Sequence, residues 1–309
     1  MTLAIVGAAG AIGRSTADAY QMAGQTVRLV GRNAGPLRAM AKPGDEIVLA
    51  DVATTEGCAK ALEGADTALY ALGLPYTKAA FAAYPEMMRL FVAAAKAAGI
   101  KRAVLITNVY PYGRPQTAKV AEDHPRVPCS VKGEYRKQQE DIFLAAQGFE
   151  AVSLRLPDFY GPNVESSQLT DAVKAARTGK MGNLLGPADQ PHEFVFTPDV
   201  GPVVKALLEH PGPVAGAYNL AGVGVTSMQD LAAQIYQAAG QPPKLRIMPP
   251  WMQGLVGLFM PVLRELGEMR YLLETPVLLD DARLRALLPN LHKTPYAEGA
   301  RVVAAVRNP

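Results

Sequence analysis

The feature that most constrains this chain is a set of three evenly spaced glycines close to its first residue. Gly7, Gly10 and Gly13 directly follow the apolar β-rich segment Leu3–Val6, and residues 12–22 have helical spacing. In a strand-to-helix turn, glycines permit unusual backbone angles, let the main chain approach a pyrophosphate and let helix and strand pack closely. The N-terminus of the helix then offers free N–H groups to the phosphates. Strand, glycines and helix in this order, followed by a second strand, predict a dinucleotide-binding unit.

The alternation of strand and helix continues through the first half of the chain. Short runs rich in β-forming residues mark the expected strands, which are Leu3–Val6, Thr26–Val30, Glu46–Leu49, Thr67–Tyr70, Ala103–Thr107, Ala151–Arg155 and, further on, Glu193–Phe196. Helical spacing marks the expected helices, which are Ile12–Met22, Thr54–Leu62, Tyr84–Ala98, Gly133–Ala146, Gln168–Thr178, Ser227–Ala239 and Pro250–Leu266. This pattern predicts an α/β fold, a Rossmann-type doubly wound parallel sheet with a smaller C-terminal lobe.

The strict alternation ends after Pro157, where prolines and glycines become frequent. We therefore expect residues 1–157 to form a dinucleotide-binding Rossmann domain, completed by the strand near residues 193–200. Residues 158–309 are expected to form mostly a second, smaller lobe. No internal repeat or low-complexity linker separates the two parts, so we expect them to pack tightly together.

Composition and charge argue against several classes of protein. The net charge is only +3 and the basic residues are dispersed, which argues against nucleic-acid binding. Cys58 and Cys129 show neither Cys-x-x-Cys spacing nor a companion histidine cluster, so we expect reduced thiols in the cytoplasm and no metal site. The N-terminal segment lacks the features of a secretory signal. The apolar stretch Pro249–Leu263 is shorter than the roughly 20 residues that cross a bilayer, so no membrane partner is expected.

The end of the second strand bears on the choice of dinucleotide. An NAD-binding protein usually places an acid there to hold the ribose hydroxyls, but residues 30–33 read Val-Gly-Arg-Asn. Arg32 would place a planar cation beside a 2′-phosphate, with Arg14 nearby, so we expect NADP(H) in preference to NAD(H). The alternative is that Arg32 is an exposed loop residue. Asp51, at the end of the third strand, is expected to accept a hydrogen bond from the adenine amino group. The remaining expected cofactor-binding residues are Ala9, Ala11, Ile12, Val52, Leu72, Gly73, Lys132 and Pro157.

Together these motifs resemble the extended and atypical branches of the short-chain dehydrogenase/reductase superfamily, including the NAD(P)-dependent epimerase/dehydratase family. Residues 7–13 match its GxxGxxG motif, residues 154–162 resemble its crossover past the nicotinamide, and residues 193–200 are similar to its later strand and turn. The resemblance covers most of the chain. It implies that residues 158–309 form mostly a substrate-binding lobe, which holds a small molecule. It also suggests a homodimer through the helices near 84–98 and 133–146.

The hydride chemistry of that family uses a Tyr-x-x-x-Lys pair and a preceding Ser or Thr, and this sequence departs from all three. Alignment of the family's usual glutamate with Glu140 places Arg136 at the lysine position and Lys132 at the tyrosine position. If Tyr112-Gly113 matches the family's Tyr-Gly, Asn108 takes the Ser/Thr position, with Thr107 beside it. A shifted alignment that pairs Tyr135 with Gln139 still lacks the lysine and loses the match at Glu140.

Lys132, Arg136 and Asn108 are therefore the predicted catalytic residues. The two cations lie one helical turn apart on one face, so either can grip the nicotinamide ribose. Lys132 can act as an acid only if burial or Arg136 lowers its pKa towards neutrality, and a clamp role is the alternative. The predicted substrate contacts are Asp158, Tyr112 and His192, each of which capping, packing or a surface role would also explain.

Three hypotheses of function follow. The first is an NAD(P)-dependent oxidoreductase or epimerase/dehydratase-like protein that acts on a small polar or sugar-like molecule, and the intact crossover favours it. The second is a non-catalytic NADP(H)-binding redox sensor, which the altered Tyr-x-x-x-Lys pair favours. The third is an assembly factor that binds a protein partner and would need an exposed apolar patch. Candidates for that patch are Trp251, Leu255, Leu258, Phe259 and Met260.

Overall fold

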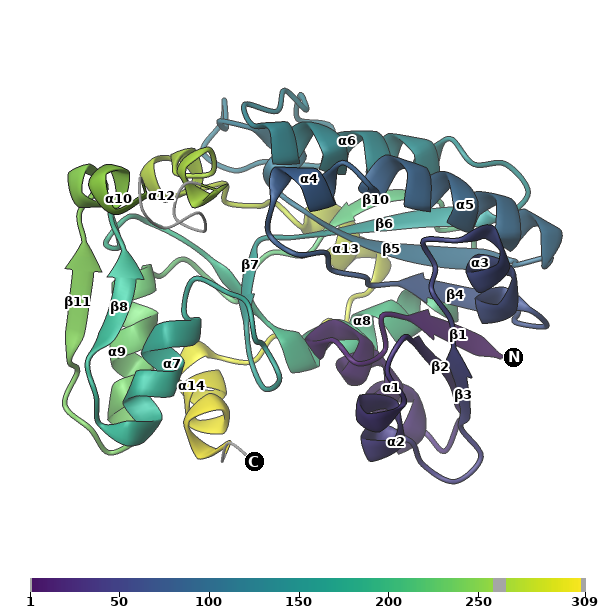
Figure 1. The fold of residues 1–309 in the computed structure, drawn as a ribbon, viewed down its shortest axis with the longest axis horizontal. Coiled ribbons are helices and arrows are strands. Elements are labelled where there is room, and N and C mark those ends of the chain that lie inside the picture. Colours follow the sequence, from purple (N-terminus) through teal and green to yellow (C-terminus); the bar gives the residue numbers. More distant parts are fainter. Residues whose placement is uncertain (1, 258–264, 307–309) are drawn as a thin grey trace.

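A seven-stranded parallel sheet forms the centre of the molecule, shown by a computed structural model that describes residues 2–257 and 265–306 (Figure 1). Its strands are β1 Leu3–Val6, β2 Val27–Gly31, β3 Glu46–Leu49, β4 Thr67–Tyr70, β5 Arg102–Asn108, β6 Glu150–Leu156 and β10 Gly216–Asn219. Their order is β10-β6-β5-β4-β1-β2-β3, and every neighbouring pair is parallel. Every residue of β1 and β4 is buried, as expected for strands covered on both faces. The strand order reverses beside β1, which is where a ligand crevice forms in this architecture.

Helices cover both faces of the sheet. One layer contains α3 Thr55–Leu62, α4 Lys78–Phe81, α5 Tyr84–Ala97 and α6 Val131–Leu144, and the other contains α1 Ala11–Met22, α2 Ala34–Met40, α8 Thr197–Leu208 and α13 Ala282–Leu287 (Figure 1). A short 3-10 turn, Tyr110–Tyr112, follows β5. Two clusters of buried apolar side chains fill the space between the sheet and these layers. Side-chain hydroxyls of Thr54 and Ser130 cap α3 and α6, and Gly99 (φ 69°) lies just after α5, as expected.

A smaller lobe packs beside the carboxyl edge of the sheet. It contains β7 Asp158–Tyr160, α7 Thr170–Thr178, β8 Gly182–Leu185, β9 Phe194–Phe196, α9 Met228–Ala238, β11 Leu245–Met248, α10 Pro250–Gly257, α12 Tyr271–Glu274 and α14 Tyr296–Ala305. β8 pairs with β11 and β7 pairs with β9, both in parallel. A separate apolar cluster forms the core of this lobe.

The predicted role of the strand near residues 193–200 is wrong. β9 pairs with β7, with Asp158 opposite Phe194, and the strand that completes the central sheet is β10. The run at residues 193–196 is short and apolar, which suits any buried strand, whereas β10 begins at Gly216 with φ 122° and carries little β signal. Because α8 and β10 also belong to the Rossmann half, the chain crosses between the two parts more than once. The expected helix Pro250–Leu266 starts as predicted, but residues 258–264 lie outside the described residues.

Candidate functional site

The glycine turn leaves the N-terminus of α1 open. A Cβ atom at Gly7 would lie 2.7 Å from the carbonyl oxygen of Ala71, and Gly7 has a φ of 85°. A Cβ at Gly13 would lie 2.7 Å from Cα of Ala8, so this glycine allows the helix to pack against the turn. A Cβ at Gly10 would meet only the carbonyl oxygen of Gly7, at 3.4 Å. Gly10 is exposed, and no side chain caps α1. The first N–H groups of α1 are therefore available to an anionic ligand.

A pocket of about 240 Å³ lies at the carboxyl ends of β1, β2 and β3. Five of the expected cofactor residues line it, namely Gly7, Arg32, Asp51, Val52 and Leu72. Its other lining residues are Val6, Val30, Gly31, Ala50, Ala53, Leu74, Ala80, Ala83 and Met87. The wall formed by α4 and α5 carries no sequence motif, so it could not be predicted from the sequence. Apolar walls with a few polar groups at the rim are typical of a site for a planar heterocycle.

Arg32 is exposed at the rim of this pocket. Within residues 2–257 and 265–306, its guanidinium has no ion-pair partner at 4.0 Å or less. The carboxylate of Asp51 accepts a hydrogen bond from the backbone N–H of Ala53 at 3.1 Å. Arg14 lies next to the glycine turn, where its Nε donates to the carbonyl oxygen of Ala9 at 2.9 Å. The pocket rim therefore combines a free cation near the end of β2 with a carboxylate at the end of β3.

Lys132 is fully buried and directed toward the C-terminal lobe. Its Nζ donates to Oε2 of Glu265 at 2.6 Å, to the carbonyl oxygen of the same residue at 2.9 Å, and to Oε1 of Glu268 at 2.7 Å. The hydrogen bond from Lys132 lowers the pKa of Glu265. Because an ammonium has three N–H bonds, this arrangement leaves none for a substrate or a ribose.

Arg136 points toward the sheet and α5. It is 6% exposed, its Nη2 donates to the carbonyl oxygen of Ile106 at 3.0 Å, and its Nη1 donates to Gln139 at 2.6 Å. Its guanidinium carbon lies 4.6 Å from the ring centroid of Tyr84, and its buried Nε has no hydrogen-bond partner. Lys132 and Arg136 thus diverge, although helical spacing places them on one face. Asn108, the third predicted catalytic residue, accepts the backbone N–H of the first residue of the 3-10 turn at 3.1 Å.

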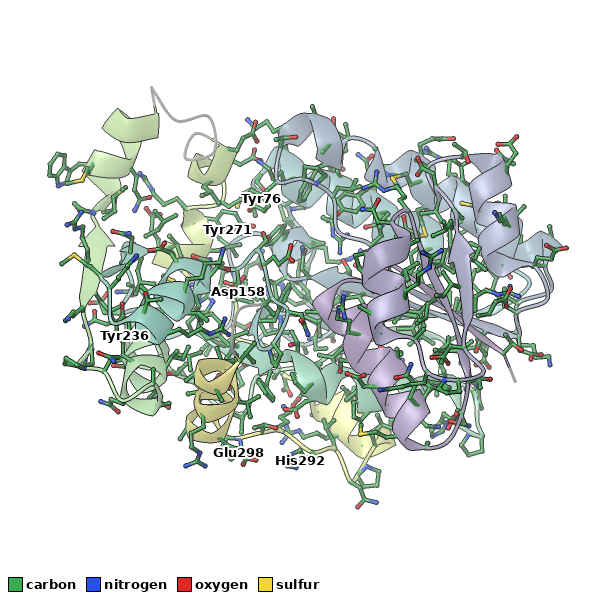
Figure 2. All side chains as sticks on the ribbon, turned by 60° about the horizontal axis from the view of Figure 1, so that its bottom comes forward. Tyr76, Asp158, Tyr236, Tyr271, His292 and Glu298 are labelled. Carbon is green, nitrogen blue, oxygen red and sulfur yellow. The ribbon has the colours of Figure 1, made fainter. Side chains whose placement is uncertain are left out.

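Asp158 and His192, both predicted substrate contacts, lie together where the lobe meets the sheet. Nε2 of His192 is 2.9 Å from Oδ2 of Asp158, which also accepts Nε2 of Gln168 at 3.0 Å. Nearby, the hydroxyls of Tyr76 and Tyr110 are 3.4 Å apart. Figure 2 shows Tyr76 and Asp158 in the region between the two parts of the molecule. Burial raises the pKa of both tyrosines well above the ordinary range, and the charge of Asp158 adds to this. Both phenols are therefore protonated at neutral pH and can donate hydrogen bonds.

Tyr76 and Gln168 were not predicted from the sequence as site residues. Tyr76 lies in a loop after β4, and Gln168 lies just before α7. Neither position belongs to a recognisable motif, because a loop residue far along the chain reaches a site only through the tertiary fold.

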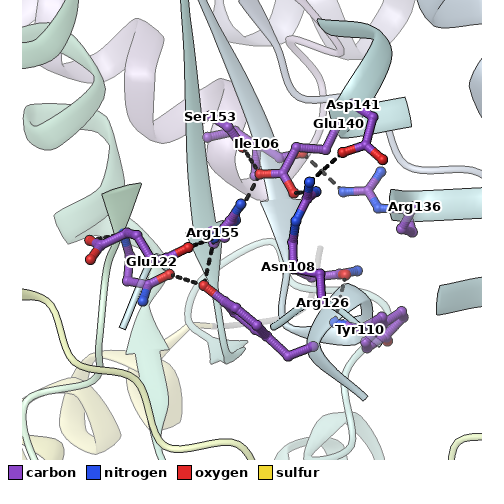
Figure 3. Close-up of polar contacts among 12 residues, drawn as sticks. Ile106, Asn108, Tyr110, Glu122, Arg126, Arg136, Glu140, Asp141, Ser153 and Arg155 are labelled. Atoms are coloured by element: carbon purple, nitrogen blue, oxygen red, sulfur yellow. Dashed lines mark hydrogen bonds and ion pairs between the residues drawn. The ribbon is translucent and has the colours of Figure 1, made fainter. Parts of the chain in front are cut away.

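Tyr112, the remaining predicted substrate contact, makes hydrogen bonds within a buried polar network. Figure 3 shows Arg155, Glu140 and Arg126 of this network. Its hydroxyl accepts Nη1 of Arg155 at 2.7 Å and donates to Oδ1 of Asn219 at 2.9 Å, and the residue is only 1% exposed. Arg155 in turn pairs with Glu140 at 2.8 Å, and Arg126 reaches Glu140 at 2.9 Å. The hydroxyl of Tyr112 is thus used in linking β6 to β10, and it is not exposed to a substrate in this structure.

The remaining expectations concern the periphery of the molecule. Trp251 is 66% exposed, but the side chains of the other candidates for an apolar patch lie outside the described residues. No described helix is both long and apolar enough to cross a membrane. Within the described residues, no group of three or more His, Cys, Asp or Glu side chains is placed to hold a metal ion.

Comparison with known proteins gives a family match and many structural neighbours. The profile of the NmrA-like family matches residues 1–275. A search of curated protein sequences gives no match. The structure of UDP-glucuronic acid 4-epimerase from Bacillus cereus, in complex with UDP-glucuronic acid and NAD, superposes with a TM-score of 0.82 and 17% identity over 98% of each chain.

Two further neighbours show the same likeness. UDP-N-acetylglucosamine 4-epimerase from Bacillus cereus has a TM-score of 0.77 and 17% identity over 98% of each chain. WbmG from Bordetella bronchiseptica, in complex with NAD, has a TM-score of 0.79 and 18% identity over 99% of this chain and 93% of the neighbour. At this level of identity the likeness establishes the Rossmann-like fold.

Proposed function

Because this chain belongs to the NmrA-like family, in the extended and atypical short-chain dehydrogenase/reductase superfamily, we propose that it is a nicotinamide dinucleotide-dependent oxidoreductase or epimerase. The substrate is a small polar or sugar-like molecule held between the sheet and the C-terminal lobe. One observation carries the proposal: the pocket at the end of β1 to β3 adjoins an uncapped helix N-terminus at the reversal of strand order. This combination suits an adenosine and a pyrophosphate.

The residues present fit the dinucleotide at its adenine end. The apolar walls of the pocket take the adenine, Asp51 accepts from its amino group, and the open turn at Gly10 leaves space for phosphates. We propose NADP(H) as the cofactor because Arg32 is a free cation at the rim, where a 2′-phosphate would lie. The neighbours WbmG and UDP-glucuronic acid 4-epimerase were solved with NAD, so Arg32 is the residue on which this preference rests.

The bound dinucleotide supplies the hydride acceptor or donor. Around the site of reaction, Tyr76 and Tyr110 remain protonated and can donate hydrogen bonds to a substrate oxygen. Asp158 and His192 line the lobe side of the same region and supply groups that can accept a proton. The amide nitrogen of Asn108 is not used by the hydrogen bond that its oxygen accepts, so it can orient a substrate carbonyl.

A redox sensor is the second candidate function. Lys132, at the family's tyrosine position, has all three N–H bonds directed to protein oxygens. A protein that binds the dinucleotide without using it chemically does not need a free acid at that position. The assembly-factor hypothesis has less support, since Trp251 is its only candidate residue with a described side chain.

Calorimetric titration with NADPH and NADH, followed by substrate screening, tests the proposal. Reduced dinucleotide is mixed with aldehydes, ketones and quinones while its absorbance is followed. Nucleotide sugars are incubated with oxidised dinucleotide, and the products are identified by NMR because an epimerase regenerates its cofactor. Dinucleotide binding with turnover of any of these substrate classes supports the enzyme hypothesis. Dinucleotide binding without turnover supports the redox-sensor hypothesis. Absence of binding to either dinucleotide would overturn both.

A further inference from the structure

Two strands of the small lobe hold His192 and Asp158 in fixed positions. Asp158 is the first residue of β7, and His192 comes just before β9, which pairs with β7. The backbone of His192 is held on both sides, since its N–H donates to the carbonyl of Thr226 at 2.6 Å and its carbonyl accepts the N–H of Thr226 at 2.7 Å. Its ring centroid lies 4.7 Å from that of Phe194. A histidine whose backbone is held by this isolated bridge, and whose ring packs against an aromatic ring, has little freedom to reorient.

The contact with Asp158 selects the tautomer of His192. A carboxylate can only accept hydrogen bonds, so the imidazole nitrogen that faces Oδ2 at 2.9 Å must carry the proton. Gln168 donates to the same oxygen and reinforces this polarity. Nε2 of His192 is therefore the protonated nitrogen, and Nδ1 carries the free lone pair. No described residue makes a hydrogen bond to Nδ1. The His192 side chain is 12% exposed and that of Asp158 is 23% exposed, so a small molecule can reach the pair.

The neighbouring titratable groups are unsuited to take up a proton from a substrate. Tyr76 and Tyr110 are protonated, and the ammonium of Lys132 is saturated by oxygens. Glu193, the residue after His192, has a raised pKa, but it is only 5% exposed and its two carboxyl oxygens accept the backbone N–H groups of Leu279 and Gly222, so a substrate does not reach it. Imidazole is the side-chain base that exchanges a proton most readily near neutral pH.

We propose that His192 is the general base of this site and that Asp158 is the positioning residue that fixes its tautomer. The substrate is a secondary alcohol. Its hydroxyl proton moves to Nδ1 of His192, its C–H bond breaks with the electron pair leaving as hydride to the oxidised nicotinamide dinucleotide, and the carbon–oxygen double bond forms. In the reverse direction the imidazolium returns the proton to the alkoxide oxygen. The inference rests on the proposed function, because the oxidised dinucleotide is the electron acceptor.

Kinetics of three variants test this assignment. We compare wild type with His192→Ala, Asp158→Asn and the control His292→Ala. The control changes an exposed histidine remote from Asp158 (Figure 2). Each protein is assayed with oxidised dinucleotide and one of three alcohols: cyclohexanol, glycerol 3-phosphate or UDP-glucose. We expect His192→Ala to lower kcat about 100-fold or more, as for loss of a general base, with unchanged dinucleotide affinity. Free imidazole should restore part of the rate of His192→Ala, and His292→Ala should match wild type. If His192→Ala fails to fold, His192→Gln keeps the donor to Asp158 and should show the same loss of kcat.

The imidazole ¹⁵N chemical shifts test the role of Asp158 without any substrate. We expect His192 to be protonated at Nε2 in wild type and to become a tautomer mixture in Asp158→Asn. A kcat for His192→Ala within about threefold of wild type, or a proton on Nδ1 in wild type, would overturn the proposal. If the dinucleotide binds but none of these alcohols is oxidised, the roles assigned to His192 and Asp158 are wrong, whereas dinucleotide binding by this protein is still supported. Absence of dinucleotide binding would instead overturn the proposed function, and the ¹⁵N shifts would still decide the tautomer.

Discussion

Lys132 and Glu268 form a buried ion pair between the Rossmann half and the C-terminal lobe, with 2.7 Å between Nζ and Oε1. Glu268 also accepts the backbone N–H of Val131 at 3.3 Å, next to the N-terminus of α6. Glu265 completes the arrangement by binding the same ammonium and the backbone N–H of Lys78. Two carboxylates near the N-termini of α4 and α6 also interact favourably with the helix dipoles. Lys132 thus connects two parts of the chain.

Replacement of Lys132 by Met tests this structural role. The side chain of Lys132 is fully buried, and its loss leaves two partly buried carboxylates without their cation. We expect the free energy of unfolding to fall by about 2 kcal/mol, somewhat less than for a fully buried pair because both glutamates can be hydrated. Hydrogen exchange at residues 265–274 should become faster. Dinucleotide affinity should stay within a few-fold of wild type.

Lys78→Met is the matched control for this variant. Lys78 is about half exposed, and its Nζ is 3.5 Å from Glu268, so its loss should change stability little. An unchanged unfolding free energy in Lys132→Met, combined with a large loss of dinucleotide affinity, would contradict the structural role and favour a ribose clamp.

The first half of the fold could be predicted from the sequence because its signals are local. Buried parallel strands are continuous apolar runs, and a glycine turn followed by helical spacing defines the first βα unit. The seventh strand could not be predicted, since the short β10 acquires its place only by pairing with β6. For the same reason the run at Glu193–Phe196, which has a stronger β-strand signal, was wrongly predicted to complete the central sheet.

The same contrast between local sequence signals and tertiary contacts applies to the residues of the candidate site. Arg32 and Asp51 follow strand ends, so their approach to one pocket could be predicted from the parallel arrangement alone. The partners of Lys132 lie more than a hundred residues away, and a spacing rule within one helix contains no information about them. The pair Asp158–His192 was predicted as two separate contacts, and its geometry depends on the unexpected pairing of β7 with β9.

Alanine substitutions at Gly10 and Gly13 should have different effects, the first on dinucleotide binding and the second on the stability of the fold. A Cβ at Gly10 has open space apart from one atom at 3.4 Å, and its φ of −73° suits alanine. Gly10→Ala should therefore fold with an unchanged melting temperature but bind the dinucleotide at least tenfold more weakly, because the methyl group occupies space needed by the phosphates. Gly13→Ala forces a Cβ against the backbone at Ala8, so it should lower the melting temperature. Calorimetry and thermal melts measure both. Equal binding of NADPH by wild type and Gly10→Ala would place the phosphates elsewhere.

Arg32→Ala should weaken NADPH much more than NADH, because only NADPH carries a 2′-phosphate. Loss of a charge-assisted hydrogen bond corresponds to about 1.5–3 kcal/mol, or roughly a 10- to 100-fold weaker affinity for NADPH. Arg38→Ala removes the same charge from an exposed position on α2 and serves as the control. Calorimetric titration of both variants with both dinucleotides measures the effect. An equal loss of affinity for NADPH and NADH in Arg32→Ala would mean that Arg32 does not contact the 2′-phosphate at the adenine end of the dinucleotide.

Glu193 connects the pH of the solution to the stability of the lobe. It is 5% exposed, and burial raises the pKa of its carboxyl to about 7, although backbone N–H groups of Leu279 and Gly222 partly oppose this shift. The ordinary value of 4.5 applies in the unfolded chain. Between these two values the folded protein holds a proton that the unfolded chain has lost, so protonation favours the folded state.

The contribution of Glu193 to stability is therefore fully present below about pH 4.5 and is lost as the pH rises through about 7. The predicted decrease in the free energy of unfolding is on the order of 3 kcal/mol across this window. Glu193→Gln stays neutral, so its difference from wild type should change with pH, whereas Glu298→Gln, at an exposed site, should follow wild type. Urea denaturation at several pH values measures all three proteins. Parallel pH profiles for wild type and Glu193→Gln would mean that this carboxyl titrates alike in the folded and unfolded states.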